Sequence, residues 1–509
     1  MATFIVRRLI ASIFIFLAAT YLMYILTALS GDPLEDLRTS TAPNKQQLIE
    51  ARTALLHLDV PPYLRYFIWI AGVGKCFIGQ CDLGVTVQNQ PVTVLLAQAA
   101  GSTLQLVTIA SVIAIILGLV VGITTALRQY SGYDYGVTFL SFLFFSLPIF
   151  WVAVLLKQFV AIGFNDFLSD PQIAPWIIPI LAVISGLIWM SILPGKGRRK
   201  LITFAAAALA SAAVIIYMDL SDWFSYPHIG IVGVALTLVG AAFGVTTIST
   251  GLKNRRALYA SLVVAGIGVA AWYPFIYFTT GLPFWGWIGI GVATVLVALA
   301  VGWFMGGDDR RPVARTAAIV GFIAFSVLSL DRFMQVWDDY ANSGRIKGRP
   351  IATIGSGTPG LEGSLWVHGV DLFTHLLLPT LALILISFAT YTRYSRASLL
   401  EVMNQDYIRT ARAKGLTERT VVVRHAFRNA LIPIATIVAF DIGGIIGGAV
   451  ITERVFGWTG MGALFQNGLD HVDPNPVMAF FLVTGSLAIL FNLIADLVYA
   501  GLDPRIRVS

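Results

Sequence analysis

Long apolar segments recur along the whole chain and constrain its fold more than any other feature. A helix needs roughly 20 apolar residues to cross the hydrocarbon core of a bilayer, and such segments recur between residues 9 and 500, separated by short charged breaks. The segment 104–127 is almost continuously apolar, without the period-two alternation of a membrane β-barrel strand. With 57% hydrophobic and only 12% charged residues, the 509-residue chain is too apolar for a soluble domain. We therefore expect an all-α polytopic membrane protein.

Apolar length and the position of charges predict about twelve transmembrane helices. Arg7 and Arg8 precede a first apolar segment of about twenty residues, longer than the core of a signal peptide, so we expect an uncleaved first span. The small residues Ala28 and Ser30 leave cleavage open as the alternative. The expected spans are 9–29, 103–127, 137–160, 174–194, 201–218, 229–250, 257–278, 284–305, 313–330, 373–394, 430–452 and 476–500.

Basic residues gather in the loops that this span count places on one side. Cytoplasmic loops carry an excess of Lys and Arg, and the segments 195–200, 253–256 and 310–315 are basic. The loop 395–429, counted together with Arg393, has eight basic and three acidic residues, a net +5 of the formal +7 of the chain. The sequence therefore predicts a multi-pass membrane protein with both termini in the cytoplasm. Because topology explains the positive charge, we expect no nucleic-acid partner.

No motif for catalysis or for a cofactor is present in the sequence. The Gly-Lys pairs at 74–75 and 195–196 lack the frame of a phosphate-binding loop, so the chain has no P-loop for ATP. The six histidines and two cysteines form no pattern typical of a metal site, and no Gly-x-Ser-x-Gly occurs. A membrane-embedded enzyme is therefore disfavoured, and we expect neither a metal nor a cofactor in this chain.

Both cysteines, Cys76 and Cys81, lie in the first hydrophilic loop, 30–100. If this loop is outside the cell, its compartment permits a disulfide between them. Two unpaired thiols are an equally good interpretation of the sequence alone.

The segment 399–433 predicts two helices joined by a glycine turn. Leu399, Val402, Met403 and Ile408 recur near helical spacing, and Gly415 is a typical residue after a helix end. Thr417 is a suitable cap for a second helix that follows. Such a bent pair fits a groove of a soluble partner. An amphipathic helix bound to anionic lipid headgroups is the alternative.

The same segment resembles the EAA loop, the ATPase-docking loop of binding-protein-dependent ABC importers, and in particular that of the oligopeptide and dipeptide branch. The matching stretches are 407–416 (YIRTARAKGL) and 424–433 (RHAFRNALIP). Where the family has Glu-Ala-Ala, this chain has Arg409-Thr410-Ala411. Further matching motifs are 30–33 (SGDP), 81–84 (CDLG), 146–148 (SLP), 453–462 (ERVFGWTGMG) and 502–507 (LDPRIR).

The resemblance implies a bacterial inner-membrane permease of the first of the two permease types, without ATPase activity of its own. Its implied partners are a second homologous permease, two ATPase subunits that hold ATP and Mg, an extracellular solute-binding protein, the peptide substrate and membrane lipid. The implied ATPase-coupling residues are Tyr407, Arg409, Thr410, Ala411, Ala413, Gly415, Arg424, His425 and Asn429.

The resemblance also implies a six-helix type I importer core that is interrupted by a six-helix insertion. An even number of added crossings keeps the coupling loop in the cytoplasm. The expected domains are 1–164, the first half of the core with outer loop 30–100; 165–330, the inserted block; 331–372, an outer loop; and 373–509, the second half of the core with coupling loop 395–429.

Two polar residues within expected spans are candidates for the translocation path. An ionised carboxylate in mid-membrane is costly unless it is paired or hydrated, and Asp441 lies near the middle of span 430–452. It is either a transient site for the amino group of a peptide or a hydrogen-bonded contact between helices. Asn492 is the second candidate. A secondary transporter built from two six-span halves is the alternative to the importer.

Overall fold

The computed structural model describes residues 2–193 and 195–502, apart from the side chains of 2–5, 419, 432, 436, 439–440, 442–448 and 495–502. Over these ranges the secondary structure is helical, with one isolated β-bridge between Val85 and Pro91. The described part contains nine helices long and apolar enough to span a membrane, or up to ten if one bent helix pair is counted as a span. The chain therefore has the all-α, polytopic character that the sequence predicts, while the count of twelve stays a prediction.

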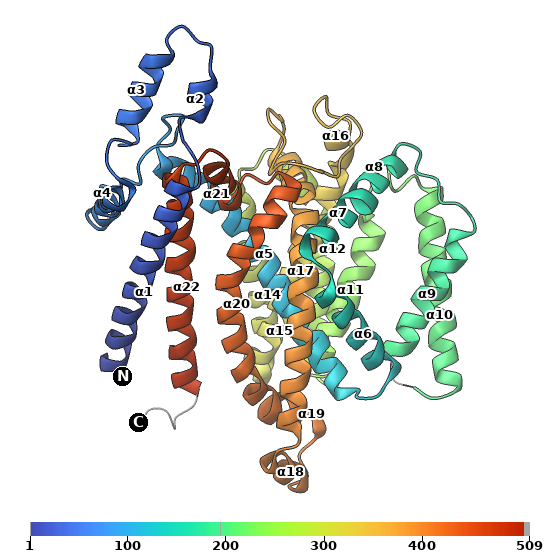
Figure 1. Cartoon of the computed structure of the whole chain (residues 1–509). Helices are drawn as coiled ribbons and strands as arrows, with labels where there is room; N and C mark the ends of the chain where they lie inside the picture. The colour runs from blue at the N-terminus through green and yellow to red at the C-terminus, as the bar shows by residue number, and fades with distance from the viewer. Residues whose placement is uncertain (1, 194, 503–509) are drawn as a thin grey trace. The chain divides into compact units, whose positions relative to one another are not determined.

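The chain divides into two compact units. The first consists of Met1–Gln158, Thr353–Ser356 and Leu376–Ser509. Its elements, shown in Figure 1, are α1 (Ala2–Leu29), α2 (Glu35–Thr39), α3 (Lys45–Leu55), α4 (Pro62–Gly74), η1 (Lys75–Ile78), α5 (Val92–Leu127), α6 (Gly132–Ser146), α7 (Ile149–Leu155), α18 (Asp406–Ala413), α19 (Glu418–Thr420), η4 (Val421–Ala426), α20 (Phe427–Phe456), α21 (Met461–Asp470) and α22 (Pro474–Leu502). The long helix α17 (Leu365–Met403) belongs to this unit from Leu376 onwards.

Helices α5 and α17 approach closely because glycines line α5. A Cβ atom on Gly118 would lie 2.4 Å from the Cβ of Tyr391, and one on Gly122 would lie 2.7 Å from the carbonyl oxygen of Thr392. Small residues permit such backbone approach between membrane helices. Leu106, which is fully buried, packs in the same core. Close packing against α5 therefore fixes the position of α17 in the first unit.

The predicted span 137–160 is not one continuous helix. Helix α6 ends at Ser146, Leu147 is extended with φ −83° and ψ 129°, and α7 begins at Ile149. Pro148 explains the break, because a proline disfavours helical backbone at the residue before it. The Ser-Leu-Pro motif is therefore a bend between two helices.

The second unit consists of Phe159–Ala352 and Gly357–His375, and it includes the block 165–330. Its elements are η2 (Leu156–Ile162, from Phe159), α8 (Gly163–Leu168), α9 (Ile177–Ile192), α10 (Arg198–Leu220), α11 (Gly230–Ser249), α12 (Arg255–Ala270), α13 (Trp272–Thr279), α14 (Phe284–Met305), η3 (Gly307–Asp309), α15 (Arg310–Gln335), α16 (Trp337–Ala341) and the first part of α17. Helices α12 and α13 form the bent pair, with an angle of 49°. Helix α9, with 16 residues, is shorter than the roughly 20 residues that a helix needs to cross a bilayer. That the block is an insertion stays a prediction.

Buried Asp331 joins three helices of the second unit. Its carboxylate accepts hydrogen bonds from the Ile229 backbone N–H at 2.6 Å, from Trp272 Nε1 at 2.7 Å and from Gln335 Nε2 at 2.7 Å. A buried carboxylate needs such donors to offset its lost hydration. Asp331 therefore serves the packing of α11, α13 and α15.

Candidate functional site

The candidate coupling segment, residues 399–433, contains a break near its start that the sequence pattern did not indicate. One helix was expected across residues 399–413, but α17 ends at Met403 and α18 begins at Asp406. Gln405 separates them in an extended conformation, with φ −73° and ψ 149°. The first residues of the expected loop, 395–403, are the last turns of α17. Arg393 and Arg396, which the prediction counted with the loop, lie inside α17.

Helix α18 is amphipathic and presents a polar face. Ile408 is fully buried and Ala411 is 6% exposed, and both pack against Leu399 and Val421. Figure 1 shows α18 beyond the ends of α17 and α20 in the first unit. The predicted coupling residues on its exposed surface are Tyr407, Arg409, Thr410 and Ala413. The apolar side thus fixes the helix to its own chain and leaves the other side accessible to a partner.

The glycine turn and the threonine cap are confirmed. Gly415 has φ +77°, a left-handed conformation that side chains rarely adopt, and its N–H donates to the Arg412 carbonyl at 2.9 Å. The Thr417 hydroxyl then accepts from the Thr420 N–H at 3.4 Å and caps α19. Local backbone chemistry therefore bends the chain here, as the sequence predicts.

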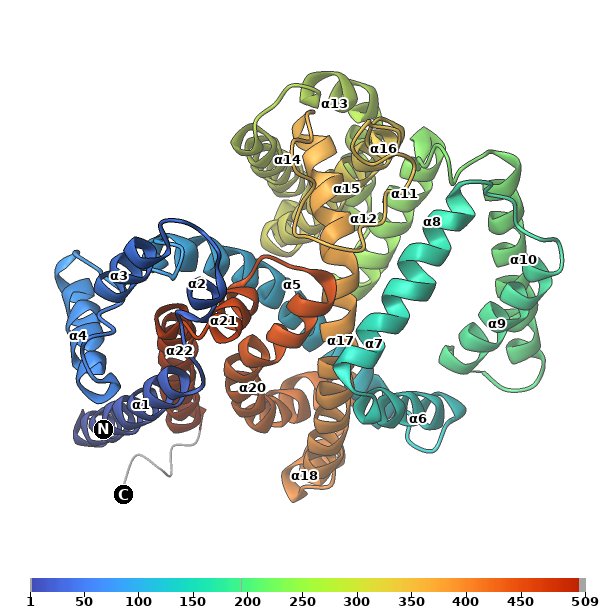
Figure 2. The ribbon, with the colours of Figure 1, turned by 45° about the horizontal axis from the view of Figure 1, so that its top comes forward.

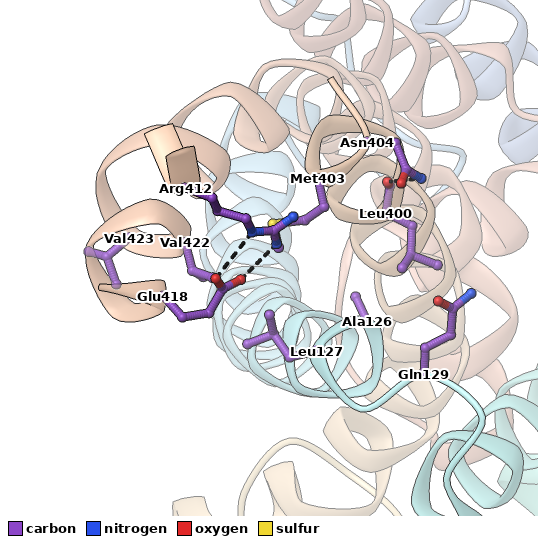
Figure 3. A pocket seen from close by; sticks show the side chains of 10 residues that line it. All are labelled: Ala126, Leu127, Gln129, Leu400, Met403, Asn404, Arg412, Glu418, Val422 and Val423. Atoms are coloured by element: carbon purple, nitrogen blue, oxygen red, sulfur yellow. Dashed lines mark hydrogen bonds and ion pairs between the residues drawn. The ribbon is translucent and has the colours of Figure 1, made fainter. Parts of the chain in front are cut away.

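An ion pair fastens the two sides of this turn. Arg412 donates from Nε and from its terminal nitrogen to the two carboxylate oxygens of Glu418, at 3.2 and 2.7 Å. The hydrogen-bonded guanidinium lowers the pKa of Glu418 below its ordinary value, and the carboxylate raises the pKa of Arg412. Both side chains border a groove of about 600 Å³, shown in Figure 3. The other lining residues are Ala126, Leu127, Gln129, Leu400, Met403, Asn404, Val422 and Val423.

A hydrogen bond connects α18 with the start of α20. Asn429 donates from Nδ2 to the Tyr407 hydroxyl at 2.9 Å and to the His425 carbonyl at 3.1 Å. His425 is half-buried, and Arg424 is exposed on the π-helical segment η4. The structure thus brings residues from both matching stretches of the coupling segment together.

Sequence reasoning missed an ion pair between α6 and α17. Asp134 is 2% exposed, and Arg396 donates to its two carboxylate oxygens at 2.7 and 2.9 Å. The Tyr130 N–H also donates to this carboxylate, at 3.0 Å. The two partners are 262 residues apart in the sequence, so no local pattern marks them. The pair ties the turn after α5 to the helix that leads into the coupling segment.

A second missed cluster surrounds Glu453. This carboxylate is fully buried and accepts from Thr103 Oγ1 at 2.6 Å and from the Gly462 N–H at 2.7 Å. A Cβ atom on Gly460 would lie 2.3 Å from a Glu453 oxygen, and one on Gly462 would lie 2.7 Å from the other. The glycines of motif 453–462 therefore make room for the carboxylate. This motif was the sequence feature that could have indicated the cluster.

The two candidates for the translocation path lie on different helices. Asp441 is half-buried on α20, within electrostatic reach of the buried hydroxyl of Tyr391 on α17. Asn492 is half-buried on α22. Among the hydrogen bonds between described residues, none joins these two side chains.

The remaining sequence-predicted features fall outside the coupling segment. Cys76 and Cys81 are joined in a disulfide. The described residues hold no group of three or more His, Cys, Asp or Glu side chains placed for a metal ion. In motif 502–507, residues 503–507 lie outside the part that the structure describes.

Comparison with known proteins identifies the family. A family model described as "Binding-protein-dependent transport system inner membrane component" matches residues 114–508. The oligopeptide transport system permease protein OppB of Mycobacterium tuberculosis is 26% identical over 509 residues, covering 100% of each chain. AppB, an oligopeptide transport system permease protein of Bacillus subtilis, is 45% identical over 137 residues, 27% of this chain and 43% of its own.

The dipeptide transport system permease protein DppB of Escherichia coli K12 is 41% identical over 138 residues, 27% of this chain and 41% of its own. The family match spans most of the chain, including the coupling segment. The protein is a member of the family of inner-membrane components of binding-protein-dependent transport systems.

Proposed function

We propose that this chain is a permease subunit of an ATP-driven system that imports peptides. The full-length similarity to an oligopeptide transport permease carries the proposal. Local similarity to oligopeptide and dipeptide permeases supports the same substrate class. The alternative of a two-half secondary transporter gains no support from the family match, which is to a component of binding-protein-dependent transport systems.

In this proposal α18 docks on a separate ATPase, and the ATP chemistry takes place there. The exposed side chains of α18, anchored by buried Ile408 and Ala411, supply the contact surface. Closure of the ATPases on ATP would displace α18, and the bonds from Asn429 to Tyr407 and from Arg412 to Glu418 would carry the movement into η4 and α20. A ligand shifts such an equilibrium only by binding one state better than the other.

We place both termini and α18 in the cytoplasm. Figure 1 shows the N-terminal end of α1 and α18 at one end of the first unit, with α2 and α3 at the opposite end. The basic loops 195–200, 253–256 and 310–315 support this orientation. A second permease, two ATPases and an extracellular binding protein complete the system, and the block 165–330 is an added six-span insertion in the permease core.

Asp441 and Asn492 are proposed to face the translocation path. Asp441 is half-buried at mid-helix on α20, and a carboxylate at that depth in a membrane requires water or a partner. If Asp441 binds the amino group of a passing peptide, Asp441→Asn lowers the uptake rate. Normal peptide uptake by this variant would leave Asp441 with only a packing role beside Tyr391.

Uptake by the reconstituted system tests the proposed function. The chain would be purified with its associated subunits, placed in proteoliposomes and supplied with the binding protein and labelled oligopeptides. We expect peptide accumulation that requires ATP and is insensitive to dissipation of ion gradients. Accumulation driven by an ion gradient without ATP would contradict the proposal.

A further inference from the structure

Helix α4, in the long loop after α1, has an exposed apolar face. Its buried face carries Tyr66, 4% exposed, and Trp69, 5% exposed. The charged residue of this 13-residue helix is Arg65, which donates to the Val60 carbonyl at 3.0 Å. The apolar side chains on the opposite face are 46% to 58% exposed: Tyr63, Leu64, Phe67 and Ile68.

The contacts of α4 with α1 place it beside the membrane span. The Tyr66 hydroxyl is 2.9 Å from Thr20 Oγ1, and the Tyr66 ring lies against the rings of Tyr21 and Tyr24, with centroids 5.2 and 5.8 Å apart. Figures 1 and 2 both show α4 next to α1.

Thr20 lies well inside the span and so sets the depth of α4. It is nine residues before Leu29, the last residue of α1, which is about 13 Å along a helix. The apolar segment 9–29, which follows Arg7 and Arg8, is about 30 Å long, the thickness of a hydrocarbon core. Thr20 therefore lies about 13 Å inside the hydrocarbon. The helix that contacts it lies at the level of the lipid leaflet.

A disulfide-closed loop extends the apolar surface of α4. The bond between Cys76 and Cys81 holds a tip at which Phe77 is 93% exposed and Ile78 is 72% exposed. The chain then returns tightly against α4, because a Cβ atom on Gly72 would lie 2.2 Å from the Asp82 carbonyl oxygen. Two large apolar side chains are thus presented by a covalently closed loop.

We propose that α4 and the closed loop 75–81 form an apolar anchor immersed in the lipid leaflet at the C-terminal end of α1. Lipid acyl chains are the proposed occupant of the exposed face, because that face adjoins the lipid-facing side of α1, where Leu22 and Leu26 are 58% and 53% exposed. Aromatic residues and an apolar helix face are typical of interfacial segments. With the orientation proposed above, this is the outer leaflet, and the anchor holds the loop that carries α2 and α3.

Photocrosslinking in the intact transporter tests the anchor. Phe77 is replaced by a benzophenone-bearing phenylalanine analogue, the complex is irradiated in native membranes, and mass spectrometry identifies the adducts. The matched control places the same analogue at Gln47, an exposed polar position on α3. We expect lipid adducts at position 77 on the order of ten-fold above those at position 47, the preference that burial of one aromatic side chain confers.

The protein adducts and a disulfide-free variant complete the test. In Cys76→Ser/Cys81→Ser we expect several-fold fewer lipid adducts at position 77, since the tip is no longer covalently held. Unchanged adduct levels would overturn the role of the disulfide. If the dominant product at position 77 is the second permease, the binding protein or no adduct at all, the lipid anchor is overturned, while the proposed peptide uptake is measured independently.

Discussion

Arg396 of α17 and Asp134 of α6 form a two-point ion pair next to the coupling segment, with nitrogen–oxygen distances of 2.7 and 2.9 Å. The carboxylate is almost fully buried, whereas the arginine side chain is 28% exposed. Removing one member of such a pair leaves an uncompensated charge. The pair therefore holds α17 against α6 just before the candidate coupling segment.

Arg396→Met should destabilise the chain by about 3 kcal/mol, because Asp134 would keep a buried charge without its partner. Thermal unfolding in detergent measures the loss. The double variant Asp134→Leu/Arg396→Met is the control, and it should be more stable than the single variant. Equal losses in both would show that lost packing, not the orphaned charge, sets the cost.

Gly415→Val should abolish ATPase association, because a β-branched residue does not tolerate φ +77°. The surrounding space is open, with no atom within 4 Å of an added Cβ, so the strain comes from the backbone alone. Gly415→Asn is the matched control, since asparagine adopts this conformation more readily. We expect co-purified ATPase to be retained in the asparagine variant and lost in the valine variant. Loss in both variants would mean that any side chain at position 415 prevents association, so that backbone strain is not the cause.

Gly462→Ala should cost about 1 to 3 kcal/mol through overpacking. The new Cβ would lie 2.6 Å from Val450 Cα and 2.7 Å from a Glu453 oxygen. Gly101→Ala on α5 is the control, because nothing lies within 4 Å of that position. Unfolding midpoints of the two variants should differ clearly, and equal midpoints would contradict a tight glycine cradle around Glu453.

Asp473 should make stability depend on pH. Burial raises the pKa of this carboxyl from 3.8 to about 6, although the Val87 N–H donates to it at 2.8 Å. Because the native chain holds the proton more tightly than the unfolded chain, this contribution is complete below pH 3.8 and is lost as pH rises through about 6. The pKa difference corresponds to about 3 kcal/mol.

Asp473→Asn should therefore flatten the change in unfolding midpoint between about pH 4 and pH 7. Unfolding curves at several pH values for the variant and the parent chain measure this. An unchanged pH dependence in the variant would assign the titration to another group.

The features that sequence reasoning found are those that local chemistry determines. The residue types of Gly415 and Thr417 alone predict a turn and a helix cap, and the length of the apolar segments predicts the membrane helices. The break at Pro148 was equally local, but apolar continuity across 137–160 concealed it. Helix α4 was concealed in the opposite way, because the loop 30–100 was treated as hydrophilic as a whole.

The features that sequence reasoning missed depend on contacts between distant residues. Asp134 and Arg396 are 262 positions apart, and Thr103 and Glu453 are 350 apart. The packing of α6 against α17 and of α5 against α20 brings these partners together. In a single sequence, Arg396 is only one of the basic residues that indicate loop orientation, and its partner cannot be inferred from spacing.

Quantitative mass spectrometry of the tagged chain, purified from native membranes, tests the central claim that α18 couples this permease to an ATPase. We predict co-purification of a second permease and two ATPase subunits with the parent chain. In a variant with Arg409→Glu and Ala413→Glu on the exposed face of α18, the ATPases should be lost while the second permease remains. Full retention of the ATPases by this variant, or purification of the parent chain without any ATPase, would contradict the account.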